Sequence, residues 1–442
     1  MTRPIVAVVG RPNVGKSTLF NKIVGHRISI VQDRAGVTRD RLYADCEWCG
    51  NLFTLVDTGG LELKSDDVMF SFIREQVILA LDTAEVIIFV VDYKTGLTAE
   101  DYEVASMLRR TKKPVIVAVN KVDHYTPEAI CDYYSLGLGE IFGISAEAGT
   151  GVADMLDEVV KELKSHVHED EYQDAIKIAV VGRPNAGKSS LVNKILGYDR
   201  TIVSDIAGTT RDAIDTPFTR DGKRYVIIDT AGMRRQRSVD DSVESFSVMR
   251  AMYAISRADV CLIVIDAEAG ITEQDVRIAG YVHEEGKASV VVMNKWDIVE
   301  KDTYTINKFN DQLKQDLKFM DYFRSVYISA RTGKRVDQVL TMVDEVHERA
   351  TTKIKTGLLN DVIQDAISAN EPPSKNGKRL KIFYCTQVDV QPPVFALFVN
   401  DKTVMHFSYK RYLENALRSA FSLEGTPIRF SLRDKSEEDY TV

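Results

Sequence analysis

Two segments of the chain share one spacing of glycine, lysine and serine. The pattern G-x-x-x-x-G-K-S occupies residues 10–17 and again residues 182–189. Glycines at these positions let the backbone wrap closely around an anion, and the backbone N–H groups and the following helix N-terminus present positive dipoles to it. Each copy follows a short apolar run and opens a helical pattern, so the segments predict two phosphate-binding loops rather than ligand-free glycine turns.

The residues of these two loops have separate expected roles. Lys16 and Lys188 would reach the β- and γ-phosphates of a nucleotide, and Ser17 and Ser189 would ligate Mg²⁺. The other loop residues would surround the phosphates; they are Gly10, Arg11, Pro12, Asn13, Val14, Gly15 and Thr18 in the first copy, and Gly182, Arg183, Pro184, Asn185, Ala186, Gly187 and Ser190 in the second.

One N-K-x-D segment in each half of the chain indicates which nucleotide base the site selects. Each segment ends an apolar run, where ligand-facing residues collect in open α/β sheets. A carboxylate can accept hydrogen bonds from N1–H and the exocyclic amine of guanine, whereas adenine offers no such donor pair. Asp123 and Asp297 are therefore the predicted guanine readers. The loop and base edge would be held by Asn120 and Asn294, and the ring face covered by Lys121 and Lys295.

A D-T-x-G segment follows another apolar run in each half. Asp57 and Asp229 are expected to orient Mg²⁺ through water. Gly60 and Gly232 would offer a backbone N–H to the γ-phosphate, a contact that exists only before hydrolysis and can therefore order a loop with GTP and release it with GDP. The same segments contain Thr58, Gly59, Thr230 and Ala231.

A-G-x-T-R-D segments supply the remaining candidates, Thr38 and Thr210, for a second loop that senses the γ-phosphate and binds Mg²⁺. Val37 stands in the first segment where Thr209 stands in the second, but the following threonine is present in both. The candidate catalytic residues are thus Lys16, Thr38 and Gly60 in the first half, and Lys188, Thr210 and Gly232 in the second.

These motifs repeat in register, which indicates duplication of a whole domain. We expect domains at 1–165 and 176–351, an acidic linker at 166–175 and a third domain at 352–442. Within each copy, short β-branched runs such as VIIFVVD and VCLIVID alternate with helical patterns. Such alternation predicts an α/β fold, with a mostly parallel sheet covered by helices on both faces.

Composition agrees with a globular protein of the reducing cytoplasm. The chain has 442 residues, 44% of them hydrophobic and 28% charged, and a formal net charge of -8. The N-terminus shows no signal peptide and the apolar runs are too short to span a bilayer, so no membrane role is expected. Cys46 and Cys49 form a C-x-x-C pair, but no second pair or nearby histidine follows, which favours a turn over a metal site.

The region after residue 352 has a different pattern. Helical spacing at 357–367 and 409–421 alternates with strand-like runs at 379–390, 394–400 and 427–433, which predicts a small α+β module. Two basic clusters could meet phosphate groups of RNA, or the module could instead be mainly a regulatory surface between domains. The clusters are Lys375, Lys378, Arg379 and Lys381, and Lys410 with Arg411.

Taken together, the GRPNxGKS, xTRD, DTxG, NKxD and SA motifs resemble those of the EngA or Der family, bacterial GTPases with two Era-like domains in tandem and a KH-like domain. The match covers essentially the whole chain. The resemblance implies a P-loop GTPase acting in assembly of the large (50S) ribosomal subunit, whose nucleotide state controls domain arrangement and binding to rRNA. A monomer is expected.

The family pattern also implies roles for further residues. The backbone of Ser145–Ala146 and Ser329–Ala330 would support guanine O6, and Asn13 and Asn185 match an asparagine that helps to bind K⁺ in similar GTPases. That cation would neutralise charge developing between the β- and γ-phosphates, although both asparagines could instead only cap a turn. Leu61 and Met233 stand where many GTPases place a water-orienting glutamine, so intrinsic turnover should be slow.

Some expectations remain open. The C-terminal module lacks the G-x-x-G loop of a standard KH domain, so the resemblance supports its fold more than a binding mode. Residues 233–237, MRRQR, could contact phosphate or simply be solvated. A GTPase linked to tRNA modification or other RNA metabolism is the alternative; a modification enzyme would need a cofactor domain and a terminal catalytic cysteine, and neither is evident. The intact Lys, Asn and Asp positions disfavour a scaffold with degenerate sites.

Overall fold

The computed structural model describes residues 4–25, 43–57, 69–122, 127–165, 172, 174–197, 201–203, 215–230, 244–375 and 377–434. The chain divides into two compact units, residues 1–171 with 243–250 and residues 172–242 with 251–442. The first unit contains the first copy of the repeat with a short segment of the second, and the second unit contains the rest of the second copy and the C-terminal module. No helix within the described ranges is long and apolar enough to cross a membrane.

The first unit is built on a six-stranded sheet. Its strands are ordered β2 (Tyr43–Trp48), β3 (Asn51–Asp57), β1 (Ile5–Val9), β4 (Val86–Asp92), β5 (Val115–Asn120) and β6 (Ile141–Gly143). All neighbours run parallel except β2 and β3. The carboxyl ends of β1, β3 and β5 carry predicted motifs and meet at one edge of the sheet, and the parallel strands confirm the expected α/β architecture.

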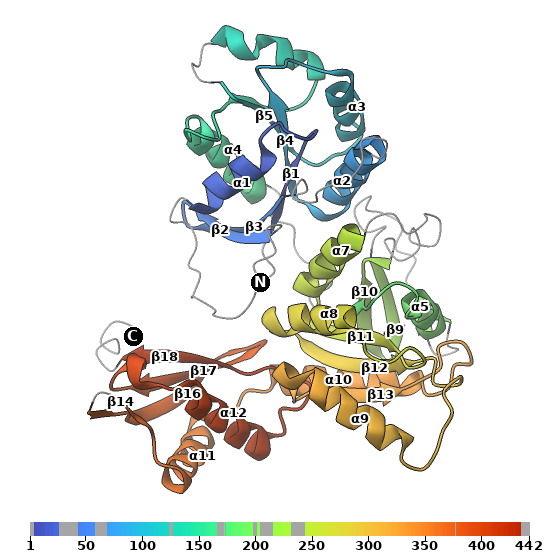
Figure 1. Cartoon of the computed structure of the whole chain (residues 1–442), viewed down its shortest axis with the longest axis vertical. Helices are drawn as coiled ribbons and strands as arrows, with labels where there is room; N and C mark the ends of the chain where they lie inside the picture. Colours follow the sequence, from blue (N-terminus) through green and yellow to red (C-terminus); the bar gives the residue numbers. More distant parts are fainter. Residues whose placement is uncertain are drawn as a thin grey trace. The chain divides into compact units, whose positions relative to one another are not determined.

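Helices cover both faces of this sheet (Figure 1). On one face α1 (Lys16–Gly25) and α4 (Val152–Ser165) pack against alternate residues of β4, including Val86 and Ile88. On the other side lie α2 (Met69–Thr83) and α3 (Ala99–Leu108), and the 3₁₀ helix η2 (Pro127–Leu136) follows β5. Every residue of β4 is buried, as expected for a central strand covered on both faces.

The second unit repeats this plan in a seven-stranded sheet. Its strands are ordered β13 (Arg324–Tyr327), β12 (Ala288–Asn294), β11 (Val260–Asp266), β7 (Ile176–Val181), β10 (Lys223–Ile228), β9 (Thr216–Arg220) and β8 (Thr201–Val203). Only β9 runs antiparallel to its two neighbours.

Side chains of β11 alternate between two cores. Val260 and Leu262 pack with α5 (Lys188–Leu196) and α10 (Asp337–Thr351). Cys261 and Ile263 face the opposite core. The elements on that second side are α7 (Glu244–Arg257), α8 (Glu273–Glu284), α9 (Thr305–Asp316) and the short η3 (Lys318–Met320). The period of two explains why the strand sequence is apolar throughout.

Two antiparallel strands, β2 and β9, were not predicted from the sequence. Each pairs with the next strand through a two-residue turn, at Cys49–Gly50 and Asp221–Gly222, in which all four φ angles are positive. Hairpin turns of this kind match the right-handed twist of the strands they join. Cys49 is exposed in its turn while Cys46 is buried within β2, so the two cysteines of the C-x-x-C pair lie in different environments.

The C-terminal module has the predicted order of helices and strands, with an added two-stranded hairpin. Its elements are α11 (Thr356–Ala369), β14 (Ser374–Lys375), β15 (Lys378–Arg379), β16 (Ile382–Val390), β17 (Pro393–Val399), η4 (Lys402–Val404), α12 (Phe407–Phe421) and β18 (Arg429–Asp434). β17 is central, antiparallel to β16 and parallel to β18. The two long helices bury Ile363 and Leu413 against the sheet.

The turn after α12 ties this module to the second sheet. Ser289 N–H, near the start of β12, donates to the Gly425 carbonyl at 2.8 Å, and Gly425 N–H donates to the Tyr322 carbonyl at 2.6 Å. The guanidinium of Arg418 lies 4.5 Å from the centre of the Tyr322 ring. Gly425 has a φ of 75° and a Cβ there would collide with Val346, so the close approach requires glycine.

Candidate nucleotide sites

The two P-loops adopt the same backbone conformation. Gly10 and Gly182 both have a φ of 149°, and a Cβ on either would collide with the carbonyl oxygen of Val90 or Val264 in the neighbouring strand. The asparagines between the glycines are left-handed, with φ values of 64° at Asn13 and 62° at Asn185. Both asparagine side chains are exposed. The glycines are therefore required by close backbone packing before any ligand is considered.

The P-loop lysines are held beneath their own loops. Lys16 Nζ donates to the carbonyls of Gly10 and Arg11, both at 2.7 Å. Lys188 makes the same pair of bonds, at 2.7 and 2.8 Å, to Gly182 and Arg183. Burial lowers the pKa of each lysine to about 8, although the charge of Asp57 for Lys16 and of Asp275 for Lys188 acts in the opposite direction. Each loop thus carries a poorly hydrated cation at its centre.

The asparagine of each N-K-x-D segment joins three of the predicted motifs. In the first domain, Asn120 Nδ2 donates to the Val14 carbonyl at 2.8 Å and Asn120 Oδ1 accepts from Ala146 N–H at 2.9 Å. Asn294 makes the equivalent bonds to Ala186 and Ala330, both at 2.9 Å. One N–H of the amide and its oxygen are engaged by the protein, so the geometry supports the predicted loop-holding role, and the second Nδ2 N–H leaves a donor for the base edge.

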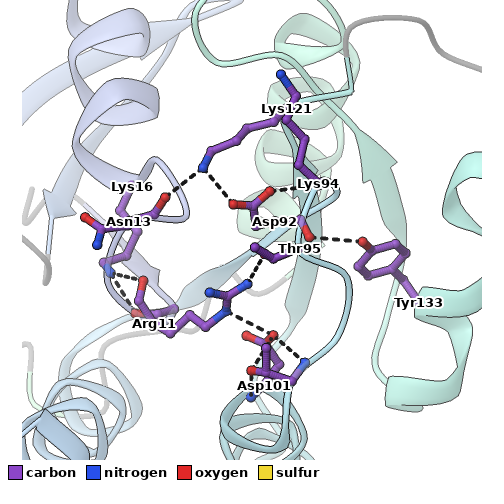
Figure 2. A network of polar contacts seen from close by, with 11 residues as sticks. Arg11, Asn13, Lys16, Asp92, Lys94, Thr95, Asp101, Lys121 and Tyr133 are labelled. Atoms are coloured by element: carbon purple, nitrogen blue, oxygen red, sulfur yellow. Dashed lines mark hydrogen bonds and ion pairs between the residues drawn. The ribbon is translucent and has the colours of Figure 1, made fainter.

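The following lysine meets a carboxylate that sequence reasoning missed. Lys121 Nζ donates to Asp92 Oδ2 at 2.6 Å and to the Asn13 carbonyl at 2.9 Å (Figure 2). Lys295 meets Asp266 at 2.6 Å in the second domain. The signal was present, because each aspartate ends a long apolar strand at the edge where the other motifs gather.

The charge of these aspartates is favoured by their partners. Burial alone would raise the pKa of Asp92, but the hydrogen bond from Lys121 and a backbone N–H bond bring the pKa below its usual value. The pKa of Asp266 is lowered in the same way by Lys295. Tyr133 donates its hydroxyl to the Asp92 carbonyl at 3.1 Å, and burial raises the pKa of that phenol to about 12. The lysine head is thereby fixed at the rim of the loop.

A cavity of about 560 Å³ adjoins the N-K-x-D segment of the second domain. Asp297 lies in its wall, and a hydrogen bond from Ser329 holds the pKa of the Asp297 carboxylate below its usual value. Ser329 Oγ also accepts from Thr332 N–H at 3.1 Å, which orders the turn behind the cavity. In the first domain, Ser145 Oγ plays the same part for Ala148 at 3.4 Å. The remaining wall residues are Trp296, Lys301, Tyr327, Ile328, Gly333 and Lys334.

The predicted Mg²⁺ ligands that the structure describes offer oxygen donors only. Ser17 is exposed in the first turn of α1, whereas Asp57 at the end of β3 is 1% exposed and acts electrostatically on Lys16. Asp229 has a φ of 57°, and its N–H donates to Asp215 Oδ1 at 3.0 Å. A hydroxyl with a carboxylate is the donor set that a hard cation prefers, so these residues fit Mg²⁺.

Several predicted site residues lie outside the described ranges, as do Leu61, Met233 and the 233–237 segment. They are Thr38, Thr58, Gly59, Gly60, Asp123, Thr210, Ala231 and Gly232. Thr230 is described and buried, with its hydroxyl 2.8 Å from that of Thr216.

The basic clusters of the C-terminal module are partly neutralised by acidic neighbours. Lys378 pairs with Asp401 at 3.4 Å, and Arg379 pairs with Glu371 at 2.5 Å. Arg411 Nη2 lies 3.8 Å from Asp321 Oδ2, which lies between η3 and β13 of the second copy of the repeat. Because an exposed ion pair contributes little stability, a phosphate could displace these partners, but the clusters are less positive than their sequence indicates.

Comparison with known proteins agrees with this geometry. The family described as 50S ribosome-binding GTPase matches residues 5–121 and 177–295, and the family described as KH-domain-like of EngA bacterial GTPase enzymes, C-terminal, matches residues 353–433. The chain is 56% identical over 440 residues to GTPase Der of Alkaliphilus oremlandii, covering 99% of this chain and 100% of that protein.

Two further relatives give the same result. GTPase Der of Acetivibrio thermocellus is 54% identical over 440 residues, and that of Alkaliphilus metalliredigens is 53% identical over 443 residues, each with 99% of this chain and 100% of the relative covered. Two GTPase matches and an EngA-type C-terminal match in one chain, with relatives similar over their full length, show that the chain belongs to the GTPase Der (EngA) family and hydrolyses GTP.

Proposed function

We propose that the chain is a GTP-driven switch that acts on the large (50S) ribosomal subunit during its assembly, and that both nucleotide sites work. The observation that carries the proposal is the repetition of one bonding scheme. In each domain a P-loop lysine, an N-K-x-D asparagine and a strand-end aspartate make matching contacts. A domain that had lost nucleotide binding would have no reason to keep a buried lysine with few countercharges.

The described residues suggest how each site handles GTP. The P-loop lysine would exchange its two carbonyl partners for phosphate oxygens, which regains the electrostatic stabilisation that burial removed. The loop N–H groups and the helix N-terminus, of α1 or α5, would bind the α- and β-phosphates. Asp297 would accept the two guanine donors in the second domain, and Asp123 would do so in the first. The rigid asparagine bridges keep base and phosphate positions at a fixed separation.

Mg²⁺ would be held by Ser17 and Asp57 in the first site and by Ser189 and Asp229 in the second, with Thr38 and Thr210 completing the sets. Bound there, Mg²⁺ would neutralise charge on the β- and γ-phosphates. Asn13 and Asn185 would help to bind K⁺. Both residues have a left-handed backbone conformation and an exposed side-chain amide. The neutral Leu61 and Met233 leave the water-orienting role unfilled, so turnover by the protein alone should be slow.

The ribosomal part of the proposal rests on the family that matches residues 5–121 and 177–295, whose description names 50S binding. The C-terminal module would contribute rRNA contacts, and Lys381 and Lys410, exposed or half-buried, would be its phosphate-contacting residues. A monomer in the cytoplasm would suffice for this role, because both nucleotide sites and the module reside in one chain.

Cosedimentation with purified 50S particles tests this proposal. The full chain would be mixed with 50S at fixed salt, with GDP, with a non-hydrolysable GTP analogue or with no nucleotide, and the pelleted fraction measured. We expect binding chiefly with the GTP analogue, and 30S particles serve as the control. Absence of 50S binding in every state, with GTP hydrolysis intact, would remove the ribosomal role and leave the enzyme.

A further inference from the structure

The arginine that follows the first glycine of each P-loop directs its side chain toward the start of a neighbouring helix, α3 in the first domain and α8 in the second. Arg11 Nε donates to Asp101 Oδ2 at 3.2 Å, and Arg11 Nη2 donates to the Thr95 hydroxyl. Figure 2 shows the guanidinium spanning the space between the loop and the first turn of α3. In the second domain, Arg183 Nε lies 3.6 Å from Asp275 Oδ2 in the first turn of α8. Both carboxylates are at most 1% exposed.

The carboxylate that receives the arginine is fixed by its own helix. Asp101 Oδ2 accepts from Thr98 N–H and from the Thr98 hydroxyl, both at 3.0 Å. Asp275 Oδ2 accepts from Thr272 N–H at 3.1 Å and from its hydroxyl at 2.8 Å. These are capping boxes, in which the threonine also caps the aspartate N–H. The carboxylate is therefore a rigid anchor.

The same arginines also contact the P-loop lysines, through the backbone. The carbonyls of Arg11 and Arg183 accept from Lys16 Nζ and Lys188 Nζ at 2.7 and 2.8 Å. Each arginine thus joins a helix N-terminus, by its side chain, to the lysine and the loop backbone, by its main chain. A loop anchored at this point loses less conformational entropy when it closes on phosphate.

We propose that Arg11 and Arg183 are positioning residues, anchored on Asp101 and Asp275, which keep each P-loop in its phosphate-binding conformation before the nucleotide arrives. This inference rests on the proposed function of the loops as phosphate sites. This arginine–aspartate contact, the tether, touches no reacting atom. The α- and β-phosphates that the P-loop would bind are common to GDP and GTP. Loss of the tether should therefore weaken both nucleotides equally and leave turnover at saturating GTP nearly unchanged.

The test must avoid leaving a buried charge without its partner, because that alone destabilises a fold. We would make Arg11→Gln with Asp101→Asn in the full chain, in a Lys188→Ala background that leaves only the first site readable. Arg110→Gln, at an exposed arginine just after α3, is the matched control. The mirror experiment uses Arg183→Gln with Asp275→Asn in a Lys16→Ala background.

The measurements are Kd for GDP and for a non-hydrolysable GTP analogue, KM and kcat for GTP, and Tm. We expect the double variant to raise both Kd values and KM about tenfold, as for loss of loop preorganisation, with kcat changed less than about twofold. A purely structural role would lower Tm and the active fraction but leave KM alone. Unchanged Kd values, or a loss confined to kcat, would overturn the proposal.

Two further variants separate this proposal from the site assignment. Lys16→Ala in the same background should weaken binding about 100-fold; if the affinity is unchanged, the phosphate site itself is misassigned, whatever the arginine contact does. Arg11→Lys keeps the positive charge beside Asp101 but cannot reach Asp101 and Thr95 together, so a smaller rise of about threefold in both Kd values is expected. If the double variant does not fold, an unchanged Kd in Arg11→Lys refutes the tether.

Discussion

The two GTPase domains share their P-loop motif but differ in how the loop is supported. Arg11 has both Asp101 and the Thr95 hydroxyl as hydrogen-bond partners. Ala269 occupies the place of Thr95 in the second domain. Among the residues described, Nε and Nη2 of Arg183 are buried without a hydrogen-bond partner. The difference teaches that duplication preserved the P-loop residues themselves, while the residues behind them diverged.

A second difference lies at the D-T-x-G strand. Asp215 binds the Asp229 N–H at 3.0 Å and is itself held by Arg257. The corresponding places in the first domain are filled by Tyr43 and Thr83, which cannot form that ion pair. Asp229 is left-handed, which for a non-glycine residue needs outside support of this kind. The two domains should therefore respond differently to changes in their supporting residues and alike to changes at the nucleotide.

The largest effect is expected at the P-loop lysines. Lys16→Ala and Lys188→Ala should each weaken nucleotide binding about 100-fold in their own domain, because a buried charge-assisted contact to phosphate is lost. Titration with a fluorescent GDP analogue should then show one tight site per chain where the parent chain shows two. If either variant still shows two tight sites, the lysine of that domain is not needed for tight binding, and the two domains differ at this residue.

Guanine reading comes next. Asp297→Asn should weaken GTP binding in the second domain about 30-fold, since one carboxylate acceptor becomes an amide donor facing the base. Xanthosine triphosphate should gain, because its 2-oxo group can accept from that amide. Competition titrations measure both, with Asp311→Asn on the exposed side of α9 as the control. Asp123→Asn should do the same in the first domain, and a result confined to one domain would show that their base sites differ.

The pH dependence of binding should be common to both domains. The nucleotide-free lysines have pKa values of about 8, lowered by burial, and only the charged form attracts phosphate. Affinity should therefore fall as pH rises through about 8, roughly threefold between about pH 7.5 and 8.5. Isothermal titrations on the Lys16→Ala and Lys188→Ala chains isolate each remaining site. A flat profile in one domain would mean that its lysine environment is not the one described.

The smallest effect concerns the loop support itself. Thr95→Ala should raise the nucleotide Kd of the first domain about threefold, in keeping with one neutral hydrogen bond. Ala269→Thr should lower the Kd of the second domain by a similar or smaller factor, because a hydroxyl would then face Arg183. If both Kd values shift as expected, the residue at position 95 or 269 accounts for the difference in loop support. If neither Kd changes, the difference between the domains lies in other residues.

Much of the fold and of the site was predictable from local patterns. Strand periodicity and the repeated motifs predicted the parallel sheets, and both P-loops, the SA turns and the C-terminal α+β module lie where expected. The hairpin strands β2 and β9 were missed because their mixed polar and apolar residues match no strand pattern. The loop-holding asparagines were assigned, but their second partners, Ala146 and Ala330, come from a motif more than twenty residues away.

The supporting carboxylates show what sequence alone left out. Asp92 and Asp101 contact lysine and arginine side chains that lie far away in the chain, so no local spacing marks the pairs. The T-x-x-D spacing at Thr98 and Asp101 is typical of a helix start, yet nothing in it indicates that one oxygen also binds the P-loop arginine. The ion pair between Lys378 and Asp401 was hidden for the same reason.

The contact between Gly15 and Asn120 limits how these domains can change over generations. A methyl group on Gly15 would collide with the Asn120 amide, whose two ends join the P-loop to the SA turn. A smaller residue at position 120 would make room, but it would lose the two hydrogen bonds of the Asn120 side chain, to Val14 and Ala146. Because Gly15 also has a φ of 95°, a side chain there is strained even when position 120 makes room, so neither position can change without loss.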